Sequence, residues 1–166
     1  YAYVPYLPSY LNAMGATATI IGYVTSSYGL SQLILRIPIG ILADLLKRQK
    51  IFVMAGVLLA GIAGLGIRLF PYPLVVLGFR GLSGVAASMW SAFTVLYSSY
   101  FPADQHTKAI GRLNSFNHLG KFLSSVLGGM VAQAFGISAP FLLSFFAGLL
   151  GFILACWIID TTPQRT

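Results

Sequence analysis

Long apolar runs with few charges constrain the fold of this chain more than any other feature. A helix that crosses the hydrocarbon core of a bilayer needs about 20 mostly apolar residues. Five segments reach that length, and a sixth, at the start of the chain, is apolar but shorter. We therefore expect an all-α integral membrane protein, one transmembrane domain over residues 1–166, with six membrane helices of which the first is truncated. The expected helices lie near residues 1–14, 18–43, 51–70, 73–100, 109–135 and 138–159.

The composition supports lipid as the surrounding solvent. Hydrophobic residues make up 57% of the chain and charged residues 8%, whereas about a quarter of a soluble domain is charged. The net charge of +7 would fit a nucleic-acid-binding protein if the basic residues were clustered. Because they are spread thinly between apolar runs, we expect the lipid bilayer and no nucleic acid as a partner.

The order of the charges predicts the orientation. Basic residues follow the even-numbered helices, while the connections on the other side offer only Arg68. Cytoplasmic connections of membrane proteins carry the excess of lysine and arginine. Both ends of the chain are therefore expected in the cytoplasm, with the protein in a plasma (inner) membrane. The residues that support this orientation are Lys47, Arg48, Lys50, Lys108, Arg112 and Arg165.

The most specific motif is GILADLLKRQK at residues 40–50. It resembles the signature of the major facilitator superfamily, G-x-L-A-D-[RK]-x-G-[RK]-[RK]. Leu45 stands where the family has a basic residue, and Lys47 where it has glycine. Gly40 would allow tight packing at the helix exit, and Asp44 would cap a helix start or pair with Arg48.

That resemblance implies a cytoplasmic gate, in which a charge pair locks one conformation and releases in another. The alternative is a basic loop that only fixes topology. The gate residues that the motif implies are Gly40, Asp44, Lys47, Arg48 and Lys50. Upstream, Arg36 and Pro38 match the approach to this motif in many members of the family, and Pro38 would kink the second helix.

A second match, R-x-x-x-G-x-x-A, lies at Arg80, Gly84 and Ala87 on the fourth expected helix. Arg80 falls roughly 10 Å from the outer end of that helix. Ionisable residues at such depth face the bundle interior or a wet cavity and are functional by default. The alternative is an arginine that snorkels to the outer headgroups.

The fifth expected helix carries a third match, to the pattern G-x-x-x-G-P-x-x-G-G. Gly120, Gly128 and Gly129 are kept as helix-packing residues, with Gly84 of the second match. Ser124 and Ser125 replace the central glycine and the proline, so the pattern still supports the family resemblance but is weaker support for the antiport function associated with it.

The same helix has a polar stripe at a spacing of three or four residues. Lys121 lies near the middle of the span, where an unpaired ammonium is costly. His118 is either a proton carrier or a packing residue. The candidate substrate or proton pathway comprises Arg36, Arg80, Asn117, His118 and Lys121.

The resemblance implies one half of a transporter with two six-helix halves, each an inverted 3+3 repeat. A faint repeat, GILAD at 40–44 and GMVAQ at 129–133, fits such a repeat. It also implies secondary transport of a small molecule by alternating access, coupled to an ion such as the proton, with a carboxy-terminal half as partner. No nucleotide-binding loop, hydrolase motif or metal-ligand spacing appears, so we expect neither an enzyme nor a cofactor or metal.

The charges by depth suggest the substrate class. Arg80 and Lys121 lie inside the expected spans, with Arg36 nearer the inner end, and no acidic residue has comparable depth. This distribution favours an anionic substrate. The alternatives are efflux of a neutral or cationic compound and a sensor or receptor that uses the same scaffold without transport.

Overall fold

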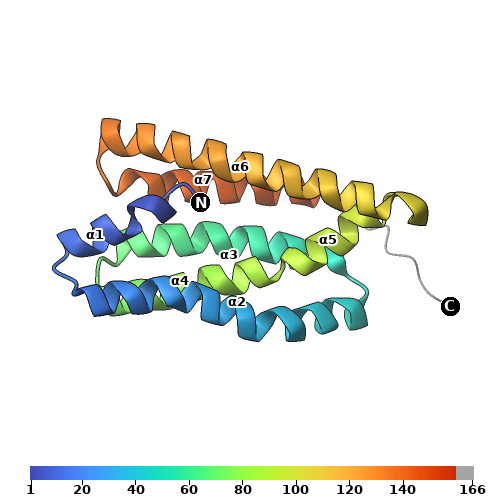
Figure 1. Ribbon diagram of the computed structural model, residues 1–166, viewed down its shortest axis with the longest axis horizontal. Coiled ribbons are helices and arrows are strands. Elements are labelled where there is room, and N and C mark those ends of the chain that lie inside the picture. The colour runs from blue at the N-terminus through green and yellow to red at the C-terminus, as the bar shows by residue number, and fades with distance from the viewer. Residues whose placement is uncertain (160–166) are drawn as a thin grey trace.

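The computed structural model describes residues 1–159, and the regular structure in that range is entirely helical (Figure 1). The elements are η1 (Val4–Tyr6), α1 (Leu7–Ala13), α2 (Ala18–Leu46), α3 (Gln49–Leu69), α4 (Pro73–Ser88), α5 (Trp90–Ser98), η2 (Ala103–Gln105), α6 (His106–Phe135) and α7 (Ala139–Cys156). Four helical segments, 18–46, 49–69, 73–98 and 139–156, are long and apolar enough to cross a membrane. The all-α membrane class expected from the sequence is thus confirmed.

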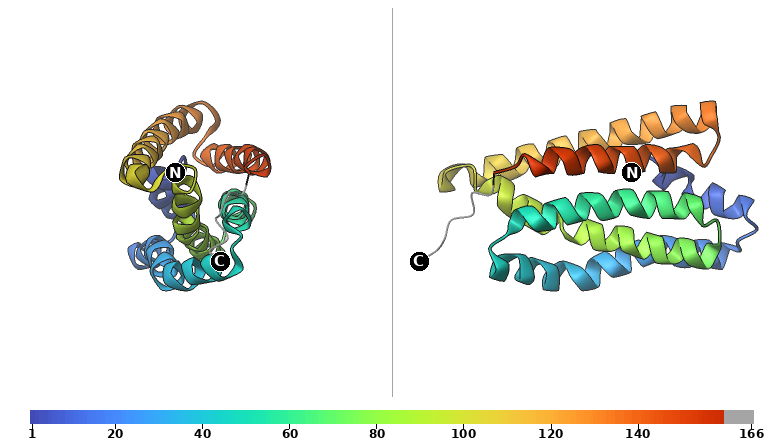
Figure 2. Two further views of the ribbon diagram at one scale, coloured as in Figure 1. Left: turned by 90° about the vertical axis from the view of Figure 1, so that its right-hand side faces the viewer. Right: turned by 180° about the vertical axis from the view of Figure 1, so that it is seen from behind.

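The long helices run side by side along one axis, so the molecule is an elongated bundle (Figure 1). Within it, α4 packs against both α2 and α3, and α3 also packs against α7. Helix α6 packs against α5 and α7 and also approaches the start of the chain, where Gly128 lies close to Ala2. Seen end-on, α4 and α5 lie near the middle and the other long helices surround them (Figure 2). A residue on α4 is therefore well placed for burial.

An aromatic core joins the start of the chain to the later helices. Phe141, at the start of α7, is completely buried. Its ring centroid lies 4.8 Å from that of Tyr3 and 4.7 Å from that of Tyr10. The cluster is completed by Leu7, Leu11, Ala16, Val24, Ile67 and Val76. A smaller cluster of Val53, Leu96 and Ala155 packs the other end of the bundle.

The helix expected over residues 73–100 is divided at Met89 into α4 and α5. Around the break, the Met89 amide donates to the Ala86 carbonyl, three residues back, at 3.3 Å. The hydroxyls of Ser88 and Ser91 also donate to carbonyls three residues back, at 2.6 and 3.2 Å. Serine hydroxyls that bond to helix carbonyls bend helices, so this break needs no proline.

The second helix is longer than expected and continues through Pro38 to Leu46. It ends at Lys47, whose φ of 50° places it in the left-handed region. This region is the usual conformation for the residue that terminates a helix, and glycine adopts it with least strain. The turn leads directly into α3, which begins at Gln49.

Candidate functional site

Arg80 is buried on the central helix α4 and lies among tyrosines. Its side chain is only 6% exposed. The guanidinium carbon lies 4.4 Å from the ring centroid of Tyr28 and 5.8 Å from that of Tyr3. Arg80 Nη1 donates to the Tyr3 hydroxyl at 3.4 Å, and that hydroxyl lies 3.0 Å from Ser83 Oγ. Arg80 therefore lies inside the protein and does not extend to the outer headgroups.

One donor of Arg80 is unused. Arg80 Nε is buried and has no hydrogen-bond partner within residues 1–159. A buried donor without a partner costs about 1–3 kcal/mol, and more when the group is charged. The neighbouring tyrosines therefore satisfy only part of the hydrogen-bonding capacity of the guanidinium, which could donate to a further ligand.

Gly84 explains why Tyr28 lies so close to Arg80. A Cβ built at Gly84 would lie 2.3 Å from the carbonyl oxygen of Tyr28 and 2.8 Å from Cβ of Ser31. Only glycine permits this approach of the α2 and α4 backbones. Because Gly84 lies one helical turn beyond Arg80, the close crossing brings the ring of Tyr28 over the guanidinium.

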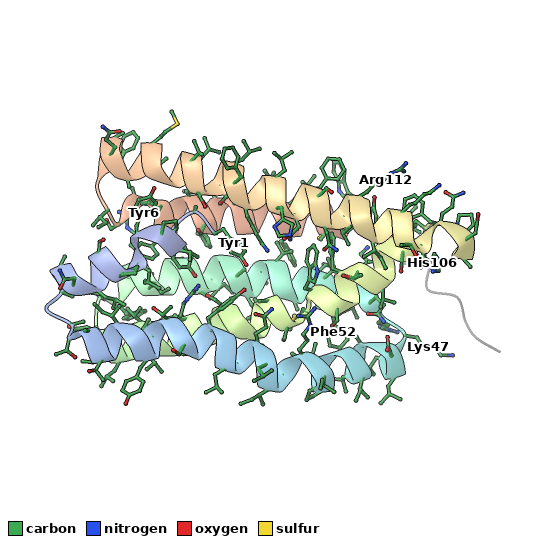
Figure 3. The ribbon with its side chains drawn as sticks, viewed as in Figure 1. Tyr1, Tyr6, Lys47, Phe52, His106 and Arg112 are labelled. Carbon is green, nitrogen blue, oxygen red and sulfur yellow. The ribbon has the colours of Figure 1, made fainter. Side chains whose placement is uncertain are left out.

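Lys121 reaches the same group of tyrosines from α6. Its Nζ lies 4.8 Å from the ring centroid of Tyr1, and the hydroxyls of Tyr1 and Tyr28 are 3.5 Å apart. Figure 3 shows Tyr1 partway along the bundle, away from both ends. Arg80, Lys121, Tyr1, Tyr3 and Tyr28 thus form one group, which we call the tyrosine–cation cluster.

The tyrosine–cation cluster adjoins a cavity of about 650 Å³. Its walls come from the start of the chain and from helices α2 to α7. Asn117 and Ser124 of α6 contribute polar atoms, and Trp90 and Phe93 of α5 contribute rings stacked at 5.2 Å. No aspartate or glutamate among residues 1–159 lines this space. The arrangement offers a cationic, tyrosine-rich edge and an otherwise mostly apolar wall.

Two of the predicted pathway residues, Arg36 and His118, lie apart from this cluster and its cavity. Asn117 lines the cavity, but His118 is exposed on another side of α6 and does not line it. Arg36 is exposed on α2 and is also absent from the lining. The pathway residues that the structure brings together are therefore Arg80, Asn117 and Lys121.

The glycines of the helix-packing motif differ in their surroundings. A Cβ at Gly128 would lie 2.1 Å from the carbonyl oxygen of Ala2, which is a close backbone contact. A Cβ at Gly129 would meet the Tyr6 hydroxyl at 2.6 Å. Gly120, by contrast, has no heavy atom within 4 Å of such a Cβ and lines the cavity. Only part of this motif brings helices close together.

In the 40–50 motif, Asp44 has a partner that the sequence did not predict. Its Oδ1 accepts a hydrogen bond from Gln49 Nε2 at 2.8 Å, whereas Arg48 is exposed and forms no ion pair with it within residues 1–159. Gln49 is 2% exposed and is the first residue of α3. The carboxylate therefore ties the end of α2 to the start of α3.

Two further motif residues have local contacts. Lys50 Nζ donates to the carbonyl oxygen of Cys156, at the end of α7, at 2.8 Å, which caps that helix. A Cβ at Gly40 would meet Ser91 Oγ at 3.6 Å, an ordinary contact, so the expected tight packing at Gly40 is not present. Lys47 supplies the left-handed turn described above.

Sequence reasoning missed Tyr3, Tyr28, Ser83 and Gln49. The tyrosines carry no motif, and they meet Arg80 only because the segment before η1 converges with helices α2 and α4. Gln49 had a weak signal, because it stands where the family signature has a basic residue.

Comparison with known proteins agrees with these features. The model of the Major Facilitator Superfamily matches residues 1–166. An "Uncharacterized MFS-type transporter MJ1560" of Methanocaldococcus jannaschii is 30% identical over 91% of this chain and 38% of its own length. "Quinolone resistance protein NorA" of Staphylococcus aureus is 27% identical over 98% of this chain and 42% of its own length. The chain thus spans about two fifths of these relatives, and it belongs to the Major Facilitator Superfamily.

Proposed function

We propose that this chain is the amino-terminal half of a secondary active transporter that moves a small organic anion by alternating access. The main support is the burial of Arg80: this permanent cation lies inside the protein on the central helix without a carboxylate partner in residues 1–159. The second half is a carboxy-terminal six-helix domain of the same protein, and together the halves would rock about a central site.

The anion proposal follows from the energetics of the cluster. In a low-dielectric site, attraction between a guanidinium and a carboxylate is much stronger than in water. Arginine also binds carboxylate and phosphate through two parallel hydrogen bonds. Arg80 has an unused buried donor, and Lys121 lies on the opposite side of the Tyr1–Tyr28 pair. An anionic group near the tyrosines would compensate both cations.

We also propose that the first membrane helix is completed by residues ahead of Tyr1. The helical turns of η1 and α1 together cover residues 4–13, about half of a span. The cavity continues from Tyr1 towards Val53 and Phe93, near the 46–50 turn. Preceding residues would fill that inner part. The substrate proposal therefore rests on the tyrosine–cation cluster and not on the full cavity volume.

Topology and coupling extend this proposal. We place the 46–50 and 99–105 connections in the cytoplasm of a plasma (inner) membrane, with Asp44 as part of a cytoplasmic gate. His118, exposed on α6 one turn from Lys121, is a candidate proton carrier.

Asp44→Asn should lower transport without affecting insertion. An impermeant thiol reagent should label Lys47→Cys only from the cytoplasmic side, and labelling from outside would overturn this topology.

Efflux of a drug-like compound is a second candidate, because one relative is named for quinolone resistance. A neutral or cationic compound would use the apolar and aromatic wall at Trp90 and Phe93. Under this alternative, Arg80 and Lys121 would serve gating or proton transfer and not substrate binding. A sensor that uses the same scaffold is a third candidate, and an absence of flux for every compound tested would favour it.

Flux measurements on the full-length protein in proteoliposomes separate these candidates. The panel should contain small organic carboxylates, a quinolone and a lipophilic cation, with and without a proton gradient. For an anion transporter, Arg80→Gln and Lys121→Gln should each raise KM for the carboxylate at least tenfold. Arg68→Gln, which removes a charge at the end of α3 away from the cluster, should leave KM unchanged. Transport of the cation that is undiminished in both cluster variants, with no carboxylate flux, would overturn the anion proposal.

A further inference from the structure

A second cavity lies on the surface of α6, far from the tyrosine–cation cluster. It measures about 490 Å³ and lies near the start of that helix. Its lining residues are Lys108, Gly111, Arg112, Ser115, Phe116 and Leu119. Both basic side chains are exposed, and within residues 1–159 neither forms an ion pair or a hydrogen bond. The groove thus joins two uncompensated cations to an apolar wall.

The faces of α6 differ sharply in chemistry. Ala109 and Leu113 are buried, and Asn117, Gly120 and Ser124 line the interior cavity. Asn114 and His118 form a polar exposed side, next to the partly buried Lys121. The remaining side is exposed and apolar: Phe116, Leu119, Val126 and Met130 are 69, 51, 46 and 63% exposed, and Leu123, 49% exposed, lies between this side and the interior cavity, which it also lines. That side is suited to acyl chains.

Lys108 and Arg112 continue the apolar stripe towards the start of α6. They lie four residues apart, and Arg112 is four residues before Phe116, so all three lie on one side of the helix. On the cytoplasmic orientation that the basic residues predict, this end of the stripe lies at the inner leaflet. The nearest acidic residue in sequence, Asp104 of η2, forms no ion pair with either cation in the described part of the chain.

We infer that the Lys108–Arg112 groove binds an anionic phospholipid of the inner leaflet, with the phosphate at the two cations and an acyl chain along Phe116 and Leu119. Basic residues at the cytoplasmic surface of a membrane attract anionic headgroups, and basic pockets there bind specific lipids. The polar side of α6, and not this apolar stripe, is the side suited to contact with a second protein domain. The inference does not depend on which substrate is transported.

Lipid titration of the full-length protein, followed by native mass spectrometry, tests this site. Delipidated protein would be titrated with phosphatidylglycerol or with zwitterionic phosphatidylcholine. The wild type should bind one phosphatidylglycerol at least tenfold more tightly than phosphatidylcholine. Each basic residue near an anionic lipid contributes about fivefold. Lys108→Gln and Arg112→Gln should therefore each weaken binding about fivefold, and the double variant about 25-fold.

The matched control is Lys47→Gln with Arg48→Gln, which removes the same charge from the other predicted cytoplasmic connection. It should leave the affinity for this lipid within twofold, and melting temperatures should verify that all variants are folded. An equal loss in the control, or no preference for phosphatidylglycerol in the wild type, would overturn the proposal. Competition by millimolar glycerol phosphate would identify a soluble phosphate ligand instead. Failure of a hydrophilic thiol reagent to reach Arg112→Cys in lipid-free detergent would show that protein covers the groove, and would also refute lipid binding there.

Discussion

Helices α4 and α6 each bring one basic residue to the tyrosine–cation cluster and each carry a glycine motif, yet the structure uses them differently. On α4, Arg80 is 6% exposed, and Gly84 lies against the Tyr28 carbonyl of α2. On α6, Lys121 is only partly buried and contacts one ring, while Gly120 has open space around it. On the central helix, the glycine one turn from the cation packs against a neighbouring helix, whereas on the peripheral helix the glycine next to the cation makes no such contact and the close packing of the motif lies farther along the helix.

Among the variants of α4 and α6, Gly84→Val should cause the largest loss of stability. The first carbon of any side chain at residue 84 would lie 2.3 Å from the Tyr28 carbonyl oxygen. The helices cannot separate without moving the Arg80 surroundings, so we expect destabilisation of about 3 kcal/mol or more, or failure to fold. Folded yield and thermal unfolding in detergent would measure it. Gly120→Ala is the control, and equal stability of the two variants would break the distinction between the helices.

Arg80→Gln should have the next largest effect, on stability as well as on transport. The substitution removes the cation over Tyr28 and the donor to the Tyr3 hydroxyl. Loss of these buried contacts should cost about 1–3 kcal/mol, measured as a drop in melting temperature. Arg80→Lys should not restore stability, because an ammonium lacks the planar group that lies on the Tyr28 ring. A melting temperature equal to that of the wild type would show that Arg80 is not part of the packing.

Tyr3→Phe tests the link between Arg80 and the rest of the bundle. The hydroxyl bonds both Arg80 Nη1 and Ser83 Oγ, while the ring packs on Phe141. Removing only the hydroxyl should destabilise the protein by about 1–2 kcal/mol and should weaken binding of the transported anion. Tyr6→Phe, a matched change on η1, should leave anion binding intact. Equal binding losses in both variants would argue against a specific role for Tyr3.

Lys121→Gln should have the smallest effect on stability and still impair transport. Its ammonium contacts the Tyr1 ring at a partly exposed position, where such a contact contributes about 0.5–1 kcal/mol. We therefore expect an almost unchanged melting temperature together with a raised KM for the anion. A large loss of stability would place Lys121 in the same class as Arg80 and remove the contrast between α4 and α6.

Much of the architecture could be predicted because it depends on local properties of the chain. Apolar length identified the helical segments, and the order of motifs identified the family. The break at Met89 could not be predicted, because it depends on serine–carbonyl bonds without a proline. The partners of Arg80 were also beyond reach, since Tyr3 and Tyr28 meet it only through tertiary packing, whereas the partner of Asp44 depends on the local turn that brings Gln49 back to it. Residue type predicted that Arg80 faces the interior of the bundle, which the structure shows, but not which residues surround it.

The left-handed turn at Lys47 has a consequence for how such motifs are compared. The family signature has glycine at this position, and here a lysine, with a φ of 50°, lies in the left-handed region that glycine adopts with least strain. An alignment scores this position as a mismatch, although the turn here has a shape that suits glycine. A saturation library at position 47, selected for heat resistance, should therefore enrich glycine and asparagine. Glycine is expected to gain about 1 kcal/mol, because a side chain in this conformation strains the backbone by about that amount. At this position of the loop, the backbone conformation would then matter more than the identity of the residue.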